Sequence, residues 1–143
     1  LGIMGIVCPD DAPLLGFLSL VAPAVSMGNR VVVVPSERHP LAVTDFYQVL
    51  DTSDMPDGVI NIVTGDRNSL AKVLAEHDEL DGVWYVGPVG GSEPVERASI
   101  GNLKRTWVND GRKRDWFDLV QGEGIEFLRR STQVKNIWIP YGE

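Results

Sequence analysis

Short apolar runs that recur at nearly regular spacing constrain the fold of this chain more than any other feature. Each run is rich in Val and Ile and is followed by a segment with helical periodicity. Successive βα units are about 25 to 30 residues long, as a right-handed crossover between parallel strands requires. The pattern predicts an α/β fold with a doubly wound, Rossmann-like, mostly parallel sheet. Its strands are expected at residues 2–7, 30–34, 59–63, 82–86 and 106–108.

The segments between these runs predict helices. The first, residues 14–27, is apolar on all sides and ends at Gly28 and Asn29, a helix C-cap signal. Asn68 or Ser69 is expected to cap a third helix that reaches about His77. The second and fourth helices are expected at residues 41–50 and 93–99, and residues 110–124 are interpreted as a connection.

Composition and charge exclude several classes of partner. The 143 residues carry a formal charge of -7, which disfavours nucleic acid and anionic membranes, since both reward clustered Lys and Arg. The basic residues are interpreted as a solvated face broken by acidic neighbours; they are Lys104, Arg105, Arg112, Lys113 and Arg114. No apolar run is long enough to span a bilayer.

The cysteine content and the first residue bear on the origin of the chain. A single cysteine, Cys8, excludes an internal disulfide and fits a reducing compartment, so a cytoplasmic location is expected. The chain opens with Leu1 inside an apolar run, which indicates a piece of a longer protein. His39 and His77 have no partners at metal-ligand spacing, and no metal site is expected.

The order of short motifs resembles the aldehyde dehydrogenase superfamily. Pro9-Asp10-Asp11-Ala12-Pro13 is similar to the family's Pro-Trp-Asn-Phe-Pro segment, and the run from Val31 to Leu41 is similar to the strand and Lys-Pro-Ser-Glu loop that hold the adenine ribose. The sequence Pro-Asp-Gly-Val-Ile-Asn-Ile-Val at residues 56–63 and the Asn-Leu-Lys-Arg at residues 102–105 extend the resemblance to about residue 113.

The last residues resemble a different part of the same family. Residues 122–139, and Thr-Gln-Val-Lys at 132–135 above all, are similar to the closing strand of the family's oligomerisation arm. The resemblance implies a degenerate dinucleotide-fold domain at residues 1–113, followed by a connection and a terminal arm strand at residues 114–143. The catalytic domain that should lie between them is missing. Such a chain is similar to the truncated second module of two-module aldehyde dehydrogenases.

The resemblance also indicates which catalytic groups are replaced. Asp11 stands where the family has its oxyanion asparagine, and a carboxylate offers no N–H to a developing negative charge. Asn109 stands where the family has its base glutamate and cannot accept a proton at neutral pH. Cys8 lies at the end of the first strand and is interpreted as a buried, inert thiol. No catalytic residue is therefore expected.

The cofactor positions are partly retained. Ser36 and Glu37 correspond to the ribose-binding loop, but Val34 replaces the lysine beside them, and a capped turn is the favoured interpretation of the pair. Pro88 replaces the family's pyrophosphate-binding serine and removes an N–H at an expected helix start. Gly90 and Gly91 are compatible with an anion-binding nest of backbone amides, but a pair of glycines alone is weak evidence for one. No bound cofactor is expected, and weak NAD binding is the alternative.

These expectations give two functional hypotheses. The first is a non-catalytic module with a structural role, which packs against a catalytic aldehyde dehydrogenase module of the same protein. It would form homo-oligomers through the expected strand Thr132-Pro140, which is apolar on both faces. The second is a degenerate NAD-binding domain that belongs to an NAD-dependent aldehyde dehydrogenase. In both cases the oxidation of the aldehyde would be carried out by another module.

Overall fold

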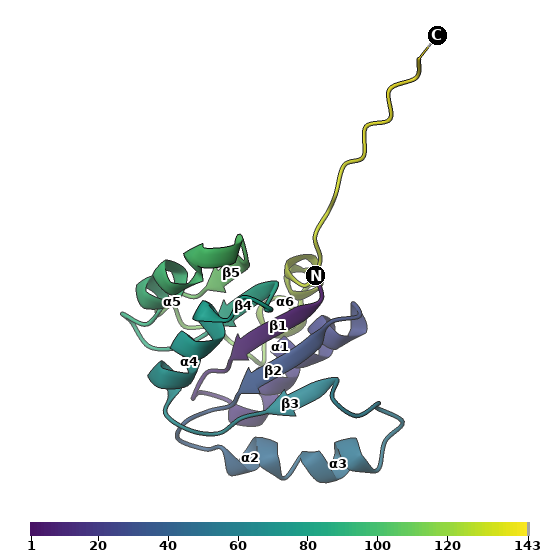
Figure 1. Cartoon of the computed structure of the whole chain (residues 1–143). Coiled ribbons are helices and arrows are strands. Elements are labelled where there is room, and N and C mark those ends of the chain that lie inside the picture. Colours follow the sequence, from purple (N-terminus) through teal and green to yellow (C-terminus); the bar gives the residue numbers. More distant parts are fainter. Residues whose placement is uncertain (143) are drawn as a thin grey trace.

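Five parallel strands form the centre of the molecule (Figure 1). The structure is a computed structural model that describes residues 1–142. The sheet order is β3-β2-β1-β4-β5, so the chain adds strands first on one side of β1 and then on the other. The predicted doubly wound sheet is confirmed, and each expected strand is present to within one residue at either end. The strands are β1 (Ile3–Val7), β2 (Arg30–Val34), β3 (Ile60–Ile62), β4 (Gly82–Tyr85) and β5 (Arg105–Val108).

Helices cover both faces of this sheet. On one face, α1 (Pro13–Ser26) packs with α6 (Leu119–Glu123) and α7 (Ile125–Arg130). On the other face lie α4 (Arg67–Glu76) and α5 (Ser92–Ala98), which continues into the 3₁₀ turn η1 (Ser99–Asn102). Two short helices, α2 (Leu41–Thr44) and α3 (Tyr47–Asp51), join β2 to β3 (Figure 1).

The strands are apolar because both faces of the sheet are buried. Alternate residues of β1 point to opposite layers: Met4 and Ile6 join the core beneath α1, and Val7 joins the core beneath α4. All four residues of β4 are buried, and Trp84 and Tyr85 fill opposite layers at its end. The continuous apolar character of these runs is therefore what two-sided coverage requires.

Two of the helices differ from the predictions. The expected helix at residues 41–50 is divided into α2 and α3 by a tighter turn, in which the amide of Phe46 donates to the carbonyl of Val43 and the amide of Val49 to that of Phe46. This turn brings the Phe46 ring to 6.0 Å from Phe17. The third helix begins earlier than expected, because its cap is Asp66, whose carboxylate accepts from the amide of Ser69 at 2.8 Å.

The predicted connection after β5 contains two helices, α6 and α7, that the sequence analysis did not foresee. Trp116 and Phe127 from this region belong to the core beneath α1. The buried amide of Asn29 ties the region to the sheet by donating to the carbonyl of Ser131 at 2.9 Å, while its oxygen accepts from the amide of Gly2. Residues 114–131 are therefore part of the body of the molecule.

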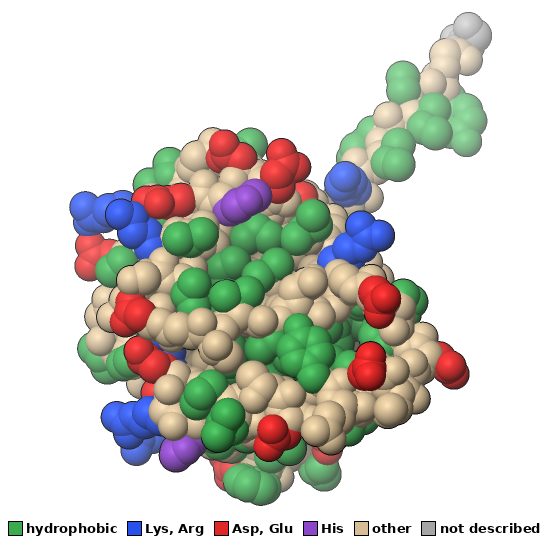
Figure 2. All heavy atoms as spheres, turned by 60° about the horizontal axis from the view of Figure 1, so that its bottom comes forward, with side chains coloured by type: hydrophobic (Ala, Val, Ile, Leu, Met, Phe, Trp, Pro, Cys, Tyr) green, Lys and Arg blue, Asp and Glu red, His purple; other side chains and the backbone are tan. Residues whose placement is uncertain are grey.

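The terminal segment, residues 132–142, is extended and contains no strand (Figure 1). The strand predicted at Thr132-Pro140 is not formed within residues 1–142, where no neighbouring strand pairs with it, and its pairing with another chain stays a prediction. Its large apolar side chains stand away from the body (Figure 2). They are between 73% and 99% exposed, and they are Val134, Ile137, Trp138, Ile139 and Tyr141. No helix in the described part of the chain is long and apolar enough to cross a membrane.

Candidate functional site

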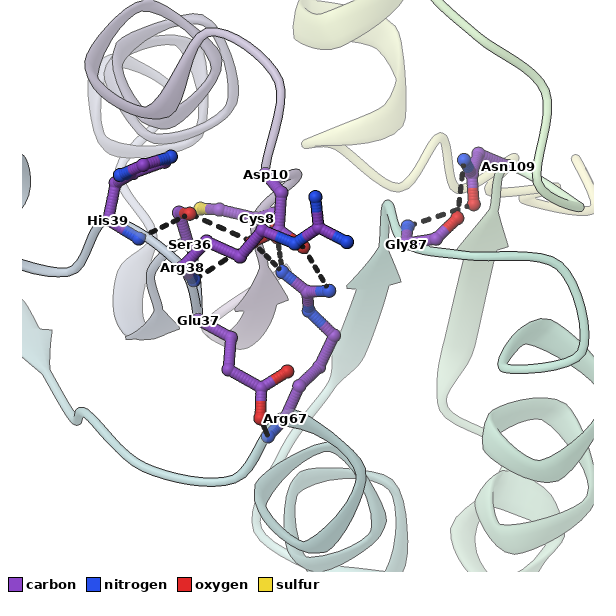
Figure 3. Close-up of polar contacts among 9 residues, drawn as sticks. All are labelled: Cys8, Asp10, Ser36, Glu37, Arg38, His39, Arg67, Gly87 and Asn109. Carbon is purple, nitrogen blue, oxygen red and sulfur yellow. Dashed lines mark hydrogen bonds and ion pairs between the residues drawn. The ribbon is translucent and has the colours of Figure 1, made fainter.

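The carboxyl ends of the strands are the natural place for a binding site in this fold. The crossovers run in opposite directions from β1, towards β2 on one side and β4 on the other, and ligands of doubly wound sheets bind at such a switch point. Four loops bring polar groups there. Asp10 follows β1, Glu37 follows β2, Arg67 begins α4 and Asn109 follows β5 (Figure 3).

An ion pair between Asp10 and Arg67 is the centre of this region. The two terminal nitrogens of Arg67 lie 2.6 and 2.8 Å from the two carboxylate oxygens of Asp10, a bidentate geometry (Figure 3). Asp10 also accepts from the hydroxyl of Ser36 at 2.8 Å and the amide of Arg38 at 3.3 Å. Hydrogen bonds from Arg67, above all, hold the pKa of Asp10 well below its usual range.

The Arg67 side chain is buried, with 3% of its surface exposed. It reaches the loop after β1, where its guanidinium also donates to the carbonyl of Cys8 at 3.4 Å. A cationic group of this protein therefore occupies part of the switch point. Among residues 1–142, Asp10 is the only carboxylate that forms an ion pair with Arg67.

Ser36 and Glu37, the expected ribose-binding residues, lie beside this pair and bond within the chain. The Ser36 hydroxyl is fully buried, donates to Asp10 and accepts from the amide of His39 at 3.1 Å, so it closes the turn that precedes α2. The Glu37 carboxylate is exposed and accepts from the amide of Arg67 at 3.4 Å, at the start of α4. These contacts fit the capped-turn interpretation, and ribose binding stays a prediction.

Asp11 and Asn109 form no hydrogen bond or ion pair with Asp10 or Arg67 among residues 1–142. Asp11 is exposed just before α1. Asn109 lies in the loop after β5, apart from Asp10 and Arg67 (Figure 3). Its amide oxygen accepts from the amide of Gly87, and its nitrogen donates to the carbonyls of Gly87 and Arg112, each at 3.1 Å. An amide can make this set of bonds and a carboxylate cannot. The correspondence of both residues with the family's catalytic positions stays a prediction.

The loop after β4 differs from the expected helix start. Helix α5 begins at Ser92, so Pro88 lies in a turn, where its carbonyl accepts from the amide of Gly91 at 3.3 Å. The expectation that Pro88 stands at a helix start is therefore wrong. Gly91 packs so closely on the Tyr85 phenol that a Cβ atom there would lie 1.8 Å from the hydroxyl oxygen, which only glycine avoids.

A cavity of about 820 Å³, the α4–α5 cavity, opens between the two helices beside this loop. Tyr85 lines it, and the Tyr85 hydroxyl is buried with no hydrogen-bond partner. Burial raises the pKa of Tyr85, so the hydroxyl keeps its proton and stays a donor. The rest of the lining is mostly small or apolar, and includes Ala71, Pro94, Val95 and Ala98.

The thiol and the histidines give no second site. Cys8 is fully buried, and burial raises its pKa far above the usual thiol range. A thiol in this state is a poor nucleophile. His39 and His77 lie at the starts of different loops, and among residues 1–142 no group of three His, Cys, Asp or Glu is placed to hold a metal ion.

Sequence reasoning missed Arg67, Tyr85 and Lys104. Arg67 has a local signal, because it follows Gly65 and the capping Asp66 directly after a strand, but its distant partner Asp10 is not encoded by spacing. Lys104, which is predicted to lie on a solvated face, is instead buried. Its ammonium donates to the carbonyls of Ala75 and His77, at 2.7 and 2.6 Å, and so closes the carboxyl end of α4. Burial lowers the pKa of Lys104.

The fold is a doubly wound, Rossmann-like α/β domain, and sequence comparison gives its family. Residues 1–117 match the Aldehyde dehydrogenase family, to which the chain belongs. It is 31% identical over 113 residues to the NADP/NAD-dependent aldehyde dehydrogenase PuuC of Escherichia coli, which covers 78% of this chain and 23% of that protein. It is 34% identical over 135 residues to the 2-hydroxymuconic semialdehyde dehydrogenase of Pseudomonas putida, covering 92% of this chain and 28% of that protein.

Solved structures agree with this assignment. Aldehyde dehydrogenase C from Pseudomonas syringae, crystallised in complex with NAD+ and octanal, superposes with a TM-score of 0.72 at 30% identity, over 75% of this chain and 22% of that one. Indole-3-acetaldehyde dehydrogenase in its apo form gives a TM-score of 0.73 at 32% identity, over 79% and 27% of the two chains. The chain thus spans only about a quarter of the length of such relatives.

Proposed function

We propose that this chain is a non-catalytic aldehyde-dehydrogenase-like module with a role in assembly. It acts within a larger aldehyde dehydrogenase, in a reducing compartment such as the cytoplasm, and packs against a catalytic module of the same protein. The observation that carries the proposal is the terminal segment. Five large apolar side chains stand in solvent on an extended stretch of backbone, an arrangement that strand pairing with a neighbour would remove.

The topology of the sheet favours a partner outside this chain. The terminal segment starts near the amino end of β5, where the Arg105 guanidinium donates to the carbonyl of Thr132 at 2.6 Å. To lie beside β5 it would have to run parallel to β5, after a crossover through α6 and α7. Since those helices cover the same face as α1, that crossover would be left-handed. About 98% of such connections are right-handed.

The chemistry of the crevice supports the absence of catalysis. A dehydrogenase that acts through a thiol needs an ionisable, reachable sulfur, a base and oxyanion donors. Here the sole thiol is buried with a raised pKa, and Asn109 uses its amide to bridge two loops. Asp11 would present a carboxylate to a developing anion. In addition, Arg67 occupies part of the switch point and is neutralised by Asp10.

Sedimentation velocity of the larger protein, with and without residues 132–143, tests the assembly role. Because the segment makes no strand contact with its own chain, its removal should leave the fold intact and reduce the assembly state. A matched control changes three polar residues of the segment, Thr132, Gln133 and Asn136, to Ser. The control should sediment like the parent. Equal sedimentation of the parent and the truncated protein would refute the role.

Weak binding of NAD is the second candidate, and the α4–α5 cavity favours it. The cavity is apolar, is large enough for a ring system, and contains an unpaired phenol at its wall. The relatives named above include an NADP/NAD-dependent enzyme and a complex with NAD+. In this reading, Glu37 would exchange its bond to the Arg67 amide for the ribose hydroxyls.

Calorimetric titration of NAD into the chain, beside the Glu37→Gln variant, tests this second candidate. Retained binding should give a measurable heat that is strongly reduced in Glu37→Gln. Asp51→Asn, an exposed carboxylate on α3, serves as the charge-matched control. Absence of heat at millimolar NAD would exclude the cofactor role and leave assembly as the function of the module.

A further inference from the structure

Basic residues gather at the carboxyl ends of the strands, although the chain as a whole is acidic. A cleft of about 420 Å³, here called the basic cleft, lies between the loops after β1, β2, β4 and β5. Its lining carries a formal charge of +3 in a chain whose total is -7, so the remaining residues together carry -10. The charged lining residues are Arg38, Arg67, Arg112, Lys113, Arg114, Asp10 and Asp11.

Pairing within the protein leaves part of this charge uncompensated. Arg67 is neutralised by Asp10, and Arg114 lies 3.1 Å from the carboxylate of Glu126. Arg112 and Lys113 form no ion pair among residues 1–142. Arg38 is 79% exposed and reaches Asp10 only at 3.9 Å. Three cations therefore face one cleft whose only other carboxylate is Asp11.

The loop that carries two of these cations is held in place. The amide of Arg112 donates to the Asn109 carbonyl at 2.9 Å, and the Asn109 side chain donates back to the Arg112 carbonyl. Gly111 has a φ of 68° and packs on Val89, where a Cβ would lie 2.3 Å from a methyl group. The cations at 112 and 113 are thus presented by a tight, docked turn, which lowers the entropy lost on binding.

Two residues that line the cleft, Arg67 and Trp116, also carry buried donors without a hydrogen-bond partner. The Nε of Arg67 and the indole Nε1 of Trp116 are both buried and have no hydrogen-bond partner. Trp116 is 5% exposed and Arg67 is 3% exposed. Buried donors without acceptors are rare and are usually satisfied by water, an ion or a ligand. Both residues line the basic cleft, and the two unpaired atoms lie beneath its surface.

We propose that the basic cleft binds a small polyanion, with phosphate or carboxylate groups, through Arg38, Arg112 and Lys113. Guanidinium groups bind such oxyanions by bidentate hydrogen bonds, and a cleft between low-dielectric walls concentrates their potential. A long polyanion such as nucleic acid does not fit, because it would extend over a surface that carries the remaining negative charge. The cleft volume lies in the range of small-molecule sites, about 300 to 1,000 Å³.

Calorimetric titration of inorganic pyrophosphate and of citrate into the 143-residue chain tests the proposal. The double variant Arg112→Gln/Lys113→Gln should bind at least about tenfold more weakly. The control, Arg30→Gln/Arg129→Gln, removes the same charge from exposed positions outside the cleft and should bind like the parent. The stronger of the two probes identifies the ligand as a phosphate or a carboxylate.

The NMR signals of the tryptophan indoles locate the binding. On titration, the Trp116 indole N–H should shift more than that of Trp84, which lies in the core away from the cleft. Equal weakening in both double variants would mean nonspecific attraction by net charge and would overturn the proposal. So would an absence of binding at millimolar anion. Neither result tests the proposed role in assembly, which sedimentation velocity measures separately.

Discussion

The guanidinium of Arg67 and the carboxylate of Asp10 join the start of α4 to the loop after β1, at 2.6 and 2.8 Å. This contact spans 57 positions in the sequence and lies at the switch point, where the strand order diverges to opposite sides of β1. An open α/β sheet usually keeps that point for a ligand. Here an internal ion pair occupies part of that place and contributes to the stability of the fold. A ligand that needed the same space would have to displace this pair.

The change Asp10→Asn should lower the free energy of unfolding by about 3 kcal/mol, because it leaves the buried Arg67 charge without a counterion. The double change Asp10→Asn/Arg67→Met removes both charges and should be more stable than the single variant. Urea denaturation monitored by tryptophan fluorescence measures both. A single variant with the same midpoint as the parent would show that the ion pair contributes no stability.

Stability should fall in acid more steeply for the parent than for Asp10→Asn. The pKa of Asp10 is lowered in the folded state, chiefly by the hydrogen bonds from Arg67. Its stabilising effect is therefore complete above the unfolded-state pKa of about 3.9 and is lost as the pH falls towards the lower native value. Thermal unfolding of both proteins between pH 7 and about pH 3 measures the difference. Parallel curves would contradict the assignment.

The change Asn109→Asp should destabilise the protein by about 1 to 3 kcal/mol. The Asn109 nitrogen donates to the carbonyls of Gly87 and Arg112, and a carboxylate oxygen there would face two acceptors. Asn136→Asp, in the exposed terminal segment, is the control and should leave the melting temperature unchanged. Differential scanning calorimetry compares the two variants. Equal melting temperatures would show that the bridge is not needed.

Two tyrosine variants should change stability in opposite directions. Tyr85→Phe removes a buried hydroxyl that has no partner and should stabilise the fold by up to about 1 kcal/mol. Tyr47→Phe removes a hydroxyl that accepts from the amide of Ile62 at 3.0 Å and should destabilise it by about 1 kcal/mol. Chemical denaturation measures both. A loss of stability in Tyr85→Phe would mean that its hydroxyl is satisfied by solvent.

The strands were predictable because the local sequence of each run specifies a strand. A run such as residues 30–34, Arg-Val-Val-Val-Val, has the β-branched composition of a strand covered on both faces, and Gly28 with a φ of 84° ends the helix before it. The helices after β5 were not predictable in this way. Residues 114–131 are mixed in charge, and their two core side chains, Trp116 and Phe127, are fixed by packing against α1.

The candidate site was predicted in part, for a related reason. Ser36, Glu37 and Asn109 were identified because family motifs mark them, and all three are at the carboxyl end of the sheet. The Asp10–Arg67 pair escaped, because it joins segments far apart in sequence, and nothing near Arg67 indicates that its guanidinium turns inwards. The terminal strand has no partner within the single chain, because alternation specifies which faces are apolar and not which chain supplies the partner.

The two outer strands are not equally open. Tyr47 covers the outward amide of Ile62 on β3, while alternation along β5 leaves the outward amides of Thr106 and Val108 without an acceptor among residues 1–142. Strand addition by another chain needs free outward amides, and the three-residue strand β3 keeps only that of Ile60 among residues 1–142. A strand supplied by another chain should therefore pair with β5 rather than with β3.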